Sequence, residues 1–209
     1  ERVVELLEFR GVRIIGVMDG YDSQAEGREL ARGMRGLINA QFLRDLSKKT
    51  HRGQAGQFSR GRHVGGVQYG YRSEPAPDGP GRVLVIDPEQ AAVVLRIYED
   101  FAAGASTRAI AHALNAAGVP APRGGTWAVS CIQGSAARGL GLLHAVVYRG
   151  RQVWNRRRWV KDPDTGRRTY VERPQSEWQV REAPELRIVS EELWERVLRR
   201  MAKIGRAHV

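Results

Sequence analysis

The sequence predicts an α+β protein in which the end of an α/β domain and a long helix precede a mixed helical and β-hairpin domain. Three patterns lead to this prediction. Val12–Met18 is a short, nearly continuous apolar run, as in a strand buried on both faces of a parallel sheet. A helical apolar period follows and continues to about Arg52. Farther along, short helices precede strands that flank the turn Asp162–Gly166.

The first elements are a helix, a strand and a long helix. Arg2–Phe9 has the apolar spacing of a helix that Gly11 would end. After the strand Val12–Met18, Ser23 and Glu26 have the S-x-x-E spacing of a capping box, which would begin the long helix. Its apolar period consists of Leu30, Met34, Leu37, Ile38, Leu43 and Leu46. The first half can form a packing or dimer face, and the second half is polar and basic.

The segment Lys48–Arg72 carries six Lys and Arg residues, six glycines and no acid. Residues 53–74 are therefore predicted to be a basic linker that lies along a nucleic-acid backbone. A solvated linker with no partner is the alternative that charge alone leaves open.

The second domain is predicted to begin with a strand and a helix. Arg82–Ile86 reads as a short strand after the turn-forming loop Pro75–Gly81. Asp87 has the character of an N-cap, and proline at the first helical position favours a helix over Pro88–Ala103.

Two further helices are expected next. Ser106 or Thr107 would cap the helix Thr107–Ala117, and Thr126 would cap the helix Trp127–Ala137. The pair resembles a helix-turn-helix, with the second helix as the recognition element, although the connection VPAPRGG is longer than the usual turn.

Strands and a last helix complete the prediction. Val146–Val160 and Arg167–Val171 are expected to be strands joined by the hairpin turn, and a further strand is expected near Trp178–Val180. Ser190 would cap a final helix, Glu191–Met201, whose first turn is acidic and whose last turn is basic.

The charge distribution points to a polyanionic partner. The net charge is +11 and the pI about 10.6. Phe101–Lys161 contains nine Arg and Lys residues and no acid. Together with Lys48–Arg72, this segment holds more positive charge than the whole chain has net, which is typical of a nucleic-acid binder. Membrane binding is disfavoured, because there is neither a Lys-rich amphipathic helix nor a membrane-spanning apolar run.

No catalytic constellation can be assembled from these residues. Ser23 is explained as a helix cap, and the histidines lack metal-ligand spacing. We therefore expect no metal and no cofactor. The single Cys131 excludes a disulfide framework and favours a cytoplasmic location.

Aromatic residues beside the cations have two possible roles. Tyr69 and Tyr71 could contact the sugar-phosphate backbone or could anchor the segment on the second domain. Trp154 and Trp159 bracket three arginines, and we expect the tryptophans to pack in the core or on the domain surface while the arginines face phosphate.

Three longer motifs together resemble the large serine recombinases, which include serine integrases and transposases of mobile elements. They are I-A-x-x-L-N-x-x-G-V-P-x-P-R-G-x-x-W (Ile110–Trp127), Y-R-G-R-Q-V-W-N (Tyr148–Asn155) and P-E-L-R-I-V-S-E-E-L-W (Pro184–Trp194). D-G-Y-D-S (Asp19–Ser23) before the long helix also resembles this family.

The resemblance implies a domain order and an activity. Residues 1–52 would be the end of a resolvase-like catalytic domain with its long helix, and residues 75–203 a DNA-binding recombinase domain. A serine located before Glu1 would cleave DNA through a phosphoserine link, so this chain alone would be inactive. The long helix would join subunits into dimers and tetramers, and a zinc-ribbon domain would follow. Residues 204–209 (IGRAHV) correspond to a translated sequencing adapter and are expected to be an artefact.

The predicted function is therefore binding of double-stranded attachment-site DNA within a site-specific recombinase. A free-standing helix-turn-helix-like DNA-binding regulator is the alternative, and a bacterial or phage origin is expected in either case. The candidate DNA contacts are Arg44, Lys48, Lys49, Thr50, Arg52, Arg60, Arg62, Tyr69, Tyr71, Arg72, Arg108, Arg123, Thr126, Ser130, Gln133, Arg138, Arg156, Arg157 and Arg158.

Overall fold

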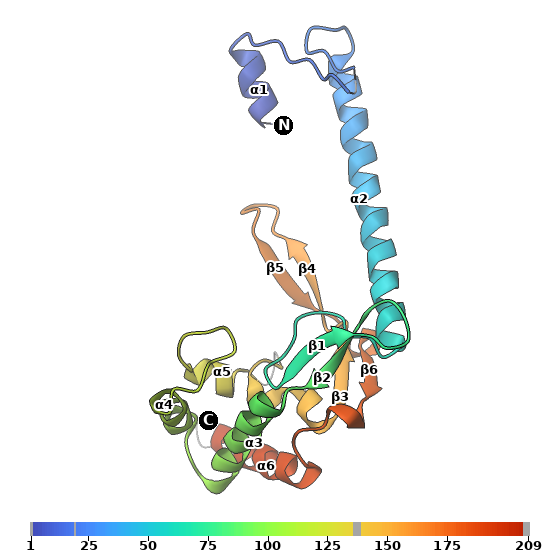
Figure 1. Ribbon diagram of the computed structural model, residues 1–209. Helices are drawn as coiled ribbons and strands as arrows, with labels where there is room; N and C mark the ends of the chain where they lie inside the picture. The colour runs from blue at the N-terminus through green and yellow to red at the C-terminus, as the bar shows by residue number, and fades with distance from the viewer. Residues whose placement is uncertain (1, 19, 136–138, 207–209) are drawn as a thin grey trace. The chain divides into compact units, whose positions relative to one another are not determined.

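The chain forms two compact units, residues 1–55 and residues 56–209 (Figure 1). The computed structural model describes residues 2–18, 20–135 and 139–206. The described residues of the two units form helices and three two-stranded antiparallel sheets, which confirms the predicted α+β class.

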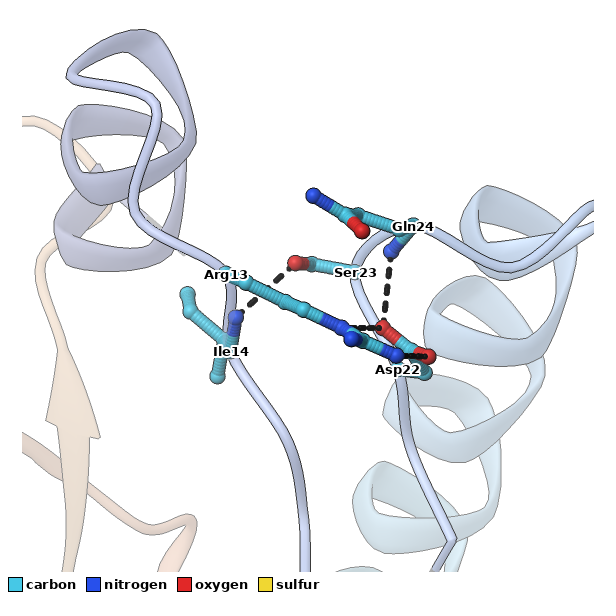
Figure 2. Close-up of polar contacts among 5 residues, drawn as sticks. All are labelled: Arg13, Ile14, Asp22, Ser23 and Gln24. Atoms are coloured by element: carbon cyan, nitrogen blue, oxygen red, sulfur yellow. Dashed lines mark hydrogen bonds and ion pairs between the residues drawn. The ribbon is translucent and has the colours of Figure 1, made fainter.

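The first unit contains helix α1 (Arg2–Phe9), as predicted, and most of helix α2 (Arg28–Ser59). Between them, two chain segments are held together by polar contacts (Figure 2). The Arg13 guanidinium donates to both Asp22 carboxylate oxygens, at 3.1 and 2.6 Å. The Ser23 hydroxyl accepts a hydrogen bond from the Ile14 backbone N–H at 2.9 Å. Arg13 and the backbone N–H of Gln24 lower the pKa of Asp22 to about 2.

Two predictions for this unit are wrong. Val12–Met18 does not form a strand, because only Ile15 pairs, through an isolated bridge with Asp22, and a central strand needs partners along its edges. Most of its apolar side chains are accordingly exposed, Val17 at 94%, and only Ile14 is partly buried. Ser23 does not cap the long helix either. The Ser23 hydroxyl is bonded to Ile14 instead, and the helix begins later, at Arg28.

Helix α2 is longer at its C-terminal end than its apolar period predicts. It continues to Ser59, through Gly53 and Gly56, so the first seven residues of the expected 53–74 linker are helical. Gln54, Ala55 and Gln57 are good helix formers and keep the cost of this segment to little more than that of the two glycines. The apolar residues that give the helix its period, Leu30 to Leu46, are all exposed.

The second unit opens with a hairpin and a helix. Strand β1 (Tyr71–Pro75) pairs antiparallel with β2 (Arg82–Ile86), which has the predicted bounds, and the end of the expected linker is thus a strand. Helix α3 (Pro88–Ala103) also has the predicted bounds. The Asp87 side chain accepts from the Gln90 N–H at 3.1 Å, which confirms the predicted cap.

The core of this unit lies between α3, α4 (Thr107–Ala116) and α6 (Glu191–Arg206). Tyr98 of α3 is fully buried, and its ring packs against Trp194 at 5.9 Å and against the edge of Tyr148 at 6.0 Å. The Tyr98 hydroxyl donates to the Leu142 carbonyl at 2.8 Å, so this buried polar group is satisfied.

Helix ends in this core have their expected caps. The Ser106 hydroxyl accepts from the Ala109 N–H and begins α4, and the Ser190 hydroxyl accepts from the Leu193 N–H and begins α6. Arg200 of α6 reaches the C-terminal end of α3, where its guanidinium donates to the Ala105 carbonyl at 2.8 Å. A cation at this position also complements the helix dipole.

The remaining elements form two small sheets and several short helical turns. Strand β3 (Arg151–Trp154) pairs with β6 (Gln179–Glu182), and β4 (Arg157–Lys161) pairs with β5 (Arg168–Glu172). The predicted hairpin is confirmed, with the Gly166 N–H bonded to the Asp162 carbonyl across the turn. The 3₁₀ turns are η1 (Leu142–His144), η2 (Val146–Arg149), η3 (Gln175–Glu177) and η4 (Pro184–Leu186).

The single strand predicted over Val146–Val160 is wrong. A 3₁₀ turn occupies its start, and two separate strands follow. The interruption falls at Asn155, which has a φ of +66° and donates from its side chain to the Glu177 carbonyl at 2.9 Å. A left-handed residue cannot continue a strand, and asparagine tolerates this conformation better than most residues.

Candidate nucleic-acid interface

Four exposed cations of α2 lie along its C-terminal half. Arg44, Lys48 and Arg52 are spaced four residues apart and therefore share one helix face. Lys49 and Thr50 are exposed on the adjoining turn. Lys48 has only a long contact of 3.9 Å with Asp45, and the Arg44 guanidinium donates to the Ala40 carbonyl of its own helix. This stripe can meet a polyanion without first breaking a strong ion pair.

Two of the candidate contacts are buried, which corrects the sequence prediction. Arg62 is 8% exposed and forms an ion pair of 2.7 Å with Asp78, and this bond lowers the pKa of Asp78. Tyr71 is 2% exposed and stacks on Tyr148 in the core. Arg62 and Tyr71 hold the β1–β2 hairpin on the second unit and are removed from the candidate DNA contacts.

The neighbouring candidates remain at the surface. Tyr69 is half-buried, with its ring against the edge of Trp127 at 5.2 Å and its hydroxyl 3.3 Å from the Pro120 carbonyl. This anchors the segment on the domain, which was the second of the two roles considered for Tyr69. Arg60 is exposed, and Arg72 is exposed and paired with Glu74 at 2.7 Å.

The connection between α4 and α5 (Val129–Gln133) is clamped by one asparagine. The Asn115 side chain donates to the Trp127 carbonyl at 3.0 Å and accepts from the Trp127 N–H at 2.6 Å. The indole N–H of Trp127 donates to the Val119 carbonyl at 2.9 Å, and the ring is 3% exposed. Residue-by-residue reasoning missed this role of Asn115, although the motif Ile110–Trp127 contains both partners.

Helix α5 is much shorter than predicted, which is a further correction. It comprises Val129–Gln133 rather than Trp127–Ala137, and Ala128 occupies the N-cap in place of Thr126. The predicted start fails because Trp127 is held in the core by Asn115. The end falls at Gly134, whose φ is +58°.

The polar candidates around α5 are all exposed. Ser130 and Gln133 lie one turn apart on the helix, on the side opposite the fully buried Ile132. Gln133 is 3.3 Å from the Thr107 hydroxyl of α4. The remaining exposed candidates of this region are Arg108, Arg123 and Thr126. Arg138 lies outside the described residues.

The three consecutive arginines before and in β4 have different surroundings. Arg156 is half-buried, with its guanidinium 4.6 Å from the centre of the Trp178 ring, and burial together with Arg157 lowers its pKa. Arg157 lies over the Tyr170 ring, also at 4.6 Å. Arg158 is exposed. Only part of this cluster therefore presents its charge freely to a partner.

The two tryptophans predicted to pack beside these arginines also differ. Trp154 is half-buried and stacks on Phe58 at 6.1 Å, as expected of a packing residue. Trp159 is 62% exposed, which excludes the core position but agrees with packing at the surface. Its ring meets that of Tyr170, its cross-strand partner, edge to face at 5.7 Å.

Nothing in the described residues forms a metal site, since no group of three His, Cys, Asp or Glu side chains comes together there. Ser23, the serine considered and set aside as a nucleophile, is 6% exposed and bonded to a backbone N–H.

The sequence profile of the Recombinase family matches residues 88–203, more than half of the chain. The chain belongs to the Recombinase family. The match runs from the start of α3 into α6 and includes the α4–α5 pair and the β4–β5 hairpin. It confirms the family resemblance drawn from the sequence motifs. It also extends well beyond a pair of helices, so nothing in it favours a free-standing helix-turn-helix regulator.

A solved structure described as a crystal structure of an LSR–DNA complex is similar to this recombinase chain. The identity is 18% and the TM-score 0.42, over 75% of this chain and 40% of that one. The recombinase chain thus spans less than half the length of the solved protein. No curated protein matches the sequence. Among the described residues, no helix is long and apolar enough to cross a membrane.

Proposed function

We propose that this chain binds double-stranded DNA as the recombinase-domain part of a site-specific serine recombinase. Membership of the Recombinase family carries the proposal. The exposed cations of α2 and of the acid-free segment Phe101–Lys161 support it, because phosphate contacts supply most of the affinity of proteins for DNA.

Two surfaces would divide the work of recognition. Arg44, Lys48, Lys49 and Arg52 of α2 would contact phosphates and contribute affinity without sequence preference. The polar side chains on the exposed side of α5, Ser130 and Gln133, would reach base edges. The bonds between Asn115 and Trp127 would fix the position of this short helix relative to α4.

The chemical step belongs to the whole recombinase. In this proposal an activated serine attacks a DNA phosphodiester, forms a phosphoserine link and releases a free DNA hydroxyl, and the reverse attack rejoins the exchanged strand. The residues of this chain bind and position DNA for that step, so the chain by itself is expected to bind DNA without cutting it. The exposed apolar residues along α2, such as Leu37, are available for homo-oligomer formation.

The salt dependence of DNA binding tests this function. Affinity for a random duplex would be measured by fluorescence anisotropy at several salt concentrations. Log affinity falls as log salt rises, and each phosphate contact contributes about 0.9 to the steepness of this fall. The triple variant Lys48→Gln, Lys49→Gln, Arg52→Gln should therefore reduce the magnitude of the slope by about 2 to 3.

A charge-matched variant provides the control. The variant Arg96→Gln, Arg196→Gln, Arg199→Gln also removes three positive charges, but from exposed positions on α3 and α6, and it should change the slope much less. Wild-type protein that does not bind DNA would contradict the proposal. Equal losses of slope in both triple variants would contradict the role of α2.

A further inference from the structure

The hairpin of β4 and β5 has two chemically different faces. Residues alternate between the faces of a strand, and the register pairs Arg157 with Glu172, Trp159 with Tyr170 and Lys161 with Arg168. These six side chains share one face, which we call the aromatic face. The other face of the strands carries Arg158, Val160, Thr169 and Val171.

On the aromatic face, rings and guanidinium groups follow one another in a continuous row. Arg157 lies over the Tyr170 ring at 4.6 Å, and Tyr170 meets Trp159 edge to face at 5.7 Å. Arg168 lies 5.7 Å from the centre of the Trp159 ring. These contacts fix the directions of side chains that would otherwise be mobile, so a partner would meet a prearranged surface.

Packing within the domain does not account for this row. In Figure 1, β4 and β5 form a ribbon that extends away from helices α3 to α6, and the main contacts of each strand are with the other. Trp159 nevertheless remains 62% exposed. Lys161 and Arg168 are exposed too, and neither forms an ion pair with any described residue.

The tip of the hairpin has the opposite charge. Asp162 and Asp164 lie in the turn, where the Asp162 carboxylate accepts hydrogen bonds from the N–H groups of Asp164 and Thr165. Two acids at the tip would repel phosphate, which disfavours entry of the ribbon into a DNA groove with its tip first. The cations lie along its flat side, between the base of the hairpin and this acidic turn.

We propose that the aromatic face of the β4–β5 hairpin lies flat on the sugar-phosphate backbone of double-stranded DNA, as a third contact beyond α2 and α5. Lys161 and Arg168 pair with phosphates, and the Trp159 ring packs against deoxyribose. The contact adds affinity without sequence preference, because it reaches no base edge. This inference rests on the proposed DNA binding of the chain.

Variants of the full chain that replace cations by glutamine test whether the aromatic face contacts DNA. Lys161→Gln with Arg168→Gln removes two cations from the aromatic face and should lower the salt slope for a random duplex by about 1 to 2. Arg196→Gln with Arg199→Gln removes two exposed cations from α6, which lies outside the hairpin, and should leave the slope nearly unchanged.

Trp159 gives an independent measurement. Trp159→Ala should weaken DNA binding several-fold at every salt concentration and leave the slope unchanged, because an apolar contact releases no counterions. Trp159→Phe keeps a ring beside Tyr170 and should retain most of the affinity. Circular dichroism and thermal unfolding of each variant verify that the domain remains folded.

Three outcomes separate this inference from the function on which it rests. A smaller slope in the aromatic-face variant alone supports the hairpin contact. Wild-type binding with equal slopes in the aromatic-face variant and the α6 variant overturns the hairpin contact and leaves DNA binding by the chain intact. Wild-type protein that does not bind DNA overturns both.

Discussion

At the scale of single residues, Tyr69 and Tyr71 show how one short motif can hold two different environments. Both are tyrosines in Y-G-Y-R, yet Tyr69 is half-buried at the surface and Tyr71 is 2% exposed. Gly70 between them has a φ of +97°, and a Cβ there would meet Ile188 at 3.0 Å. The sequence gives no sign of this difference, because it depends on contacts with residues far along the chain.

The Tyr71 hydroxyl tests the correction from DNA contact to core residue. It lies 2.7 Å from the Leu186 carbonyl and 3.1 Å from the Val147 carbonyl. Tyr71→Phe leaves these buried carbonyls with one donor fewer and should lower the free energy of unfolding by about 1 to 2 kcal/mol. The measurement is urea denaturation followed by circular dichroism.

A matched tyrosine and a DNA-binding assay separate the two roles. Tyr170 is half-exposed, and its hydroxyl has no hydrogen-bond partner among the described residues, so Tyr170→Phe should be close to neutral. Tyr71→Phe should leave the affinity for DNA at the wild-type value, because a buried hydroxyl does not reach DNA. A weakened affinity with unchanged stability would restore Tyr71 as a DNA contact.

At the scale of elements, the sequence predicts what local chemistry determines. Helix α3 and strand β2 have the predicted bounds, and the Asp162–Gly166 turn was expected from its own residues. In each case the deciding interaction joins residues close in sequence, such as Asp87 and Gln90. Clusters of Lys and Arg in the sequence likewise indicate where the candidate DNA contacts lie. They do not show which of these candidates are buried and which are exposed.

The wrong element predictions share a different cause. Val12–Met18 has the composition of a strand but lacks strand partners, and the start of α5 is displaced because Asn115 holds Trp127. Asn155, in a left-handed conformation, divides Val146–Val160. Pairing and burial across long chain distances decide these three outcomes, and single-sequence patterns contain little of that information.

Helix α5 provides the test at this scale. Ser130→Ala with Gln133→Ala should change which sequences are enriched when the protein selects from a random duplex library, because these exposed side chains would no longer contact base edges. The salt slope should stay the same, since no charge is removed.

The control keeps the helix and alters its surroundings. Thr126→Ala removes an exposed hydroxyl that does not cap α5. The selected sequences should stay unchanged, because a phosphate contact of the Thr126 hydroxyl carries no sequence information. Identical selected pools for the wild type and the double variant would mean that α5 does not read sequence.

At the scale of the whole molecule, stability and charge are distributed unequally between the two compact units. The buried apolar core extends from Tyr71 to Val197 and thus lies entirely within residues 56–209. Residues 1–55 include exposed apolar side chains such as Val17 and Leu37, together with the cations Lys48, Lys49 and Arg52. Folding stability and part of the DNA affinity should therefore be separable by truncation.

A chain reduced to residues 56–209 should retain the thermal unfolding midpoint of the longer chain, because its core contacts are all kept. Its DNA binding should remain detectable through α5 and the β4–β5 hairpin, with a salt slope smaller in magnitude by about 3 to 4 from the loss of the four α2 cations Arg44, Lys48, Lys49 and Arg52. Calorimetry and anisotropy measure the two properties on the same samples. A lower midpoint would show that residues 1–55 stabilise the core, and an unchanged slope would show that the α2 cations do not contact DNA.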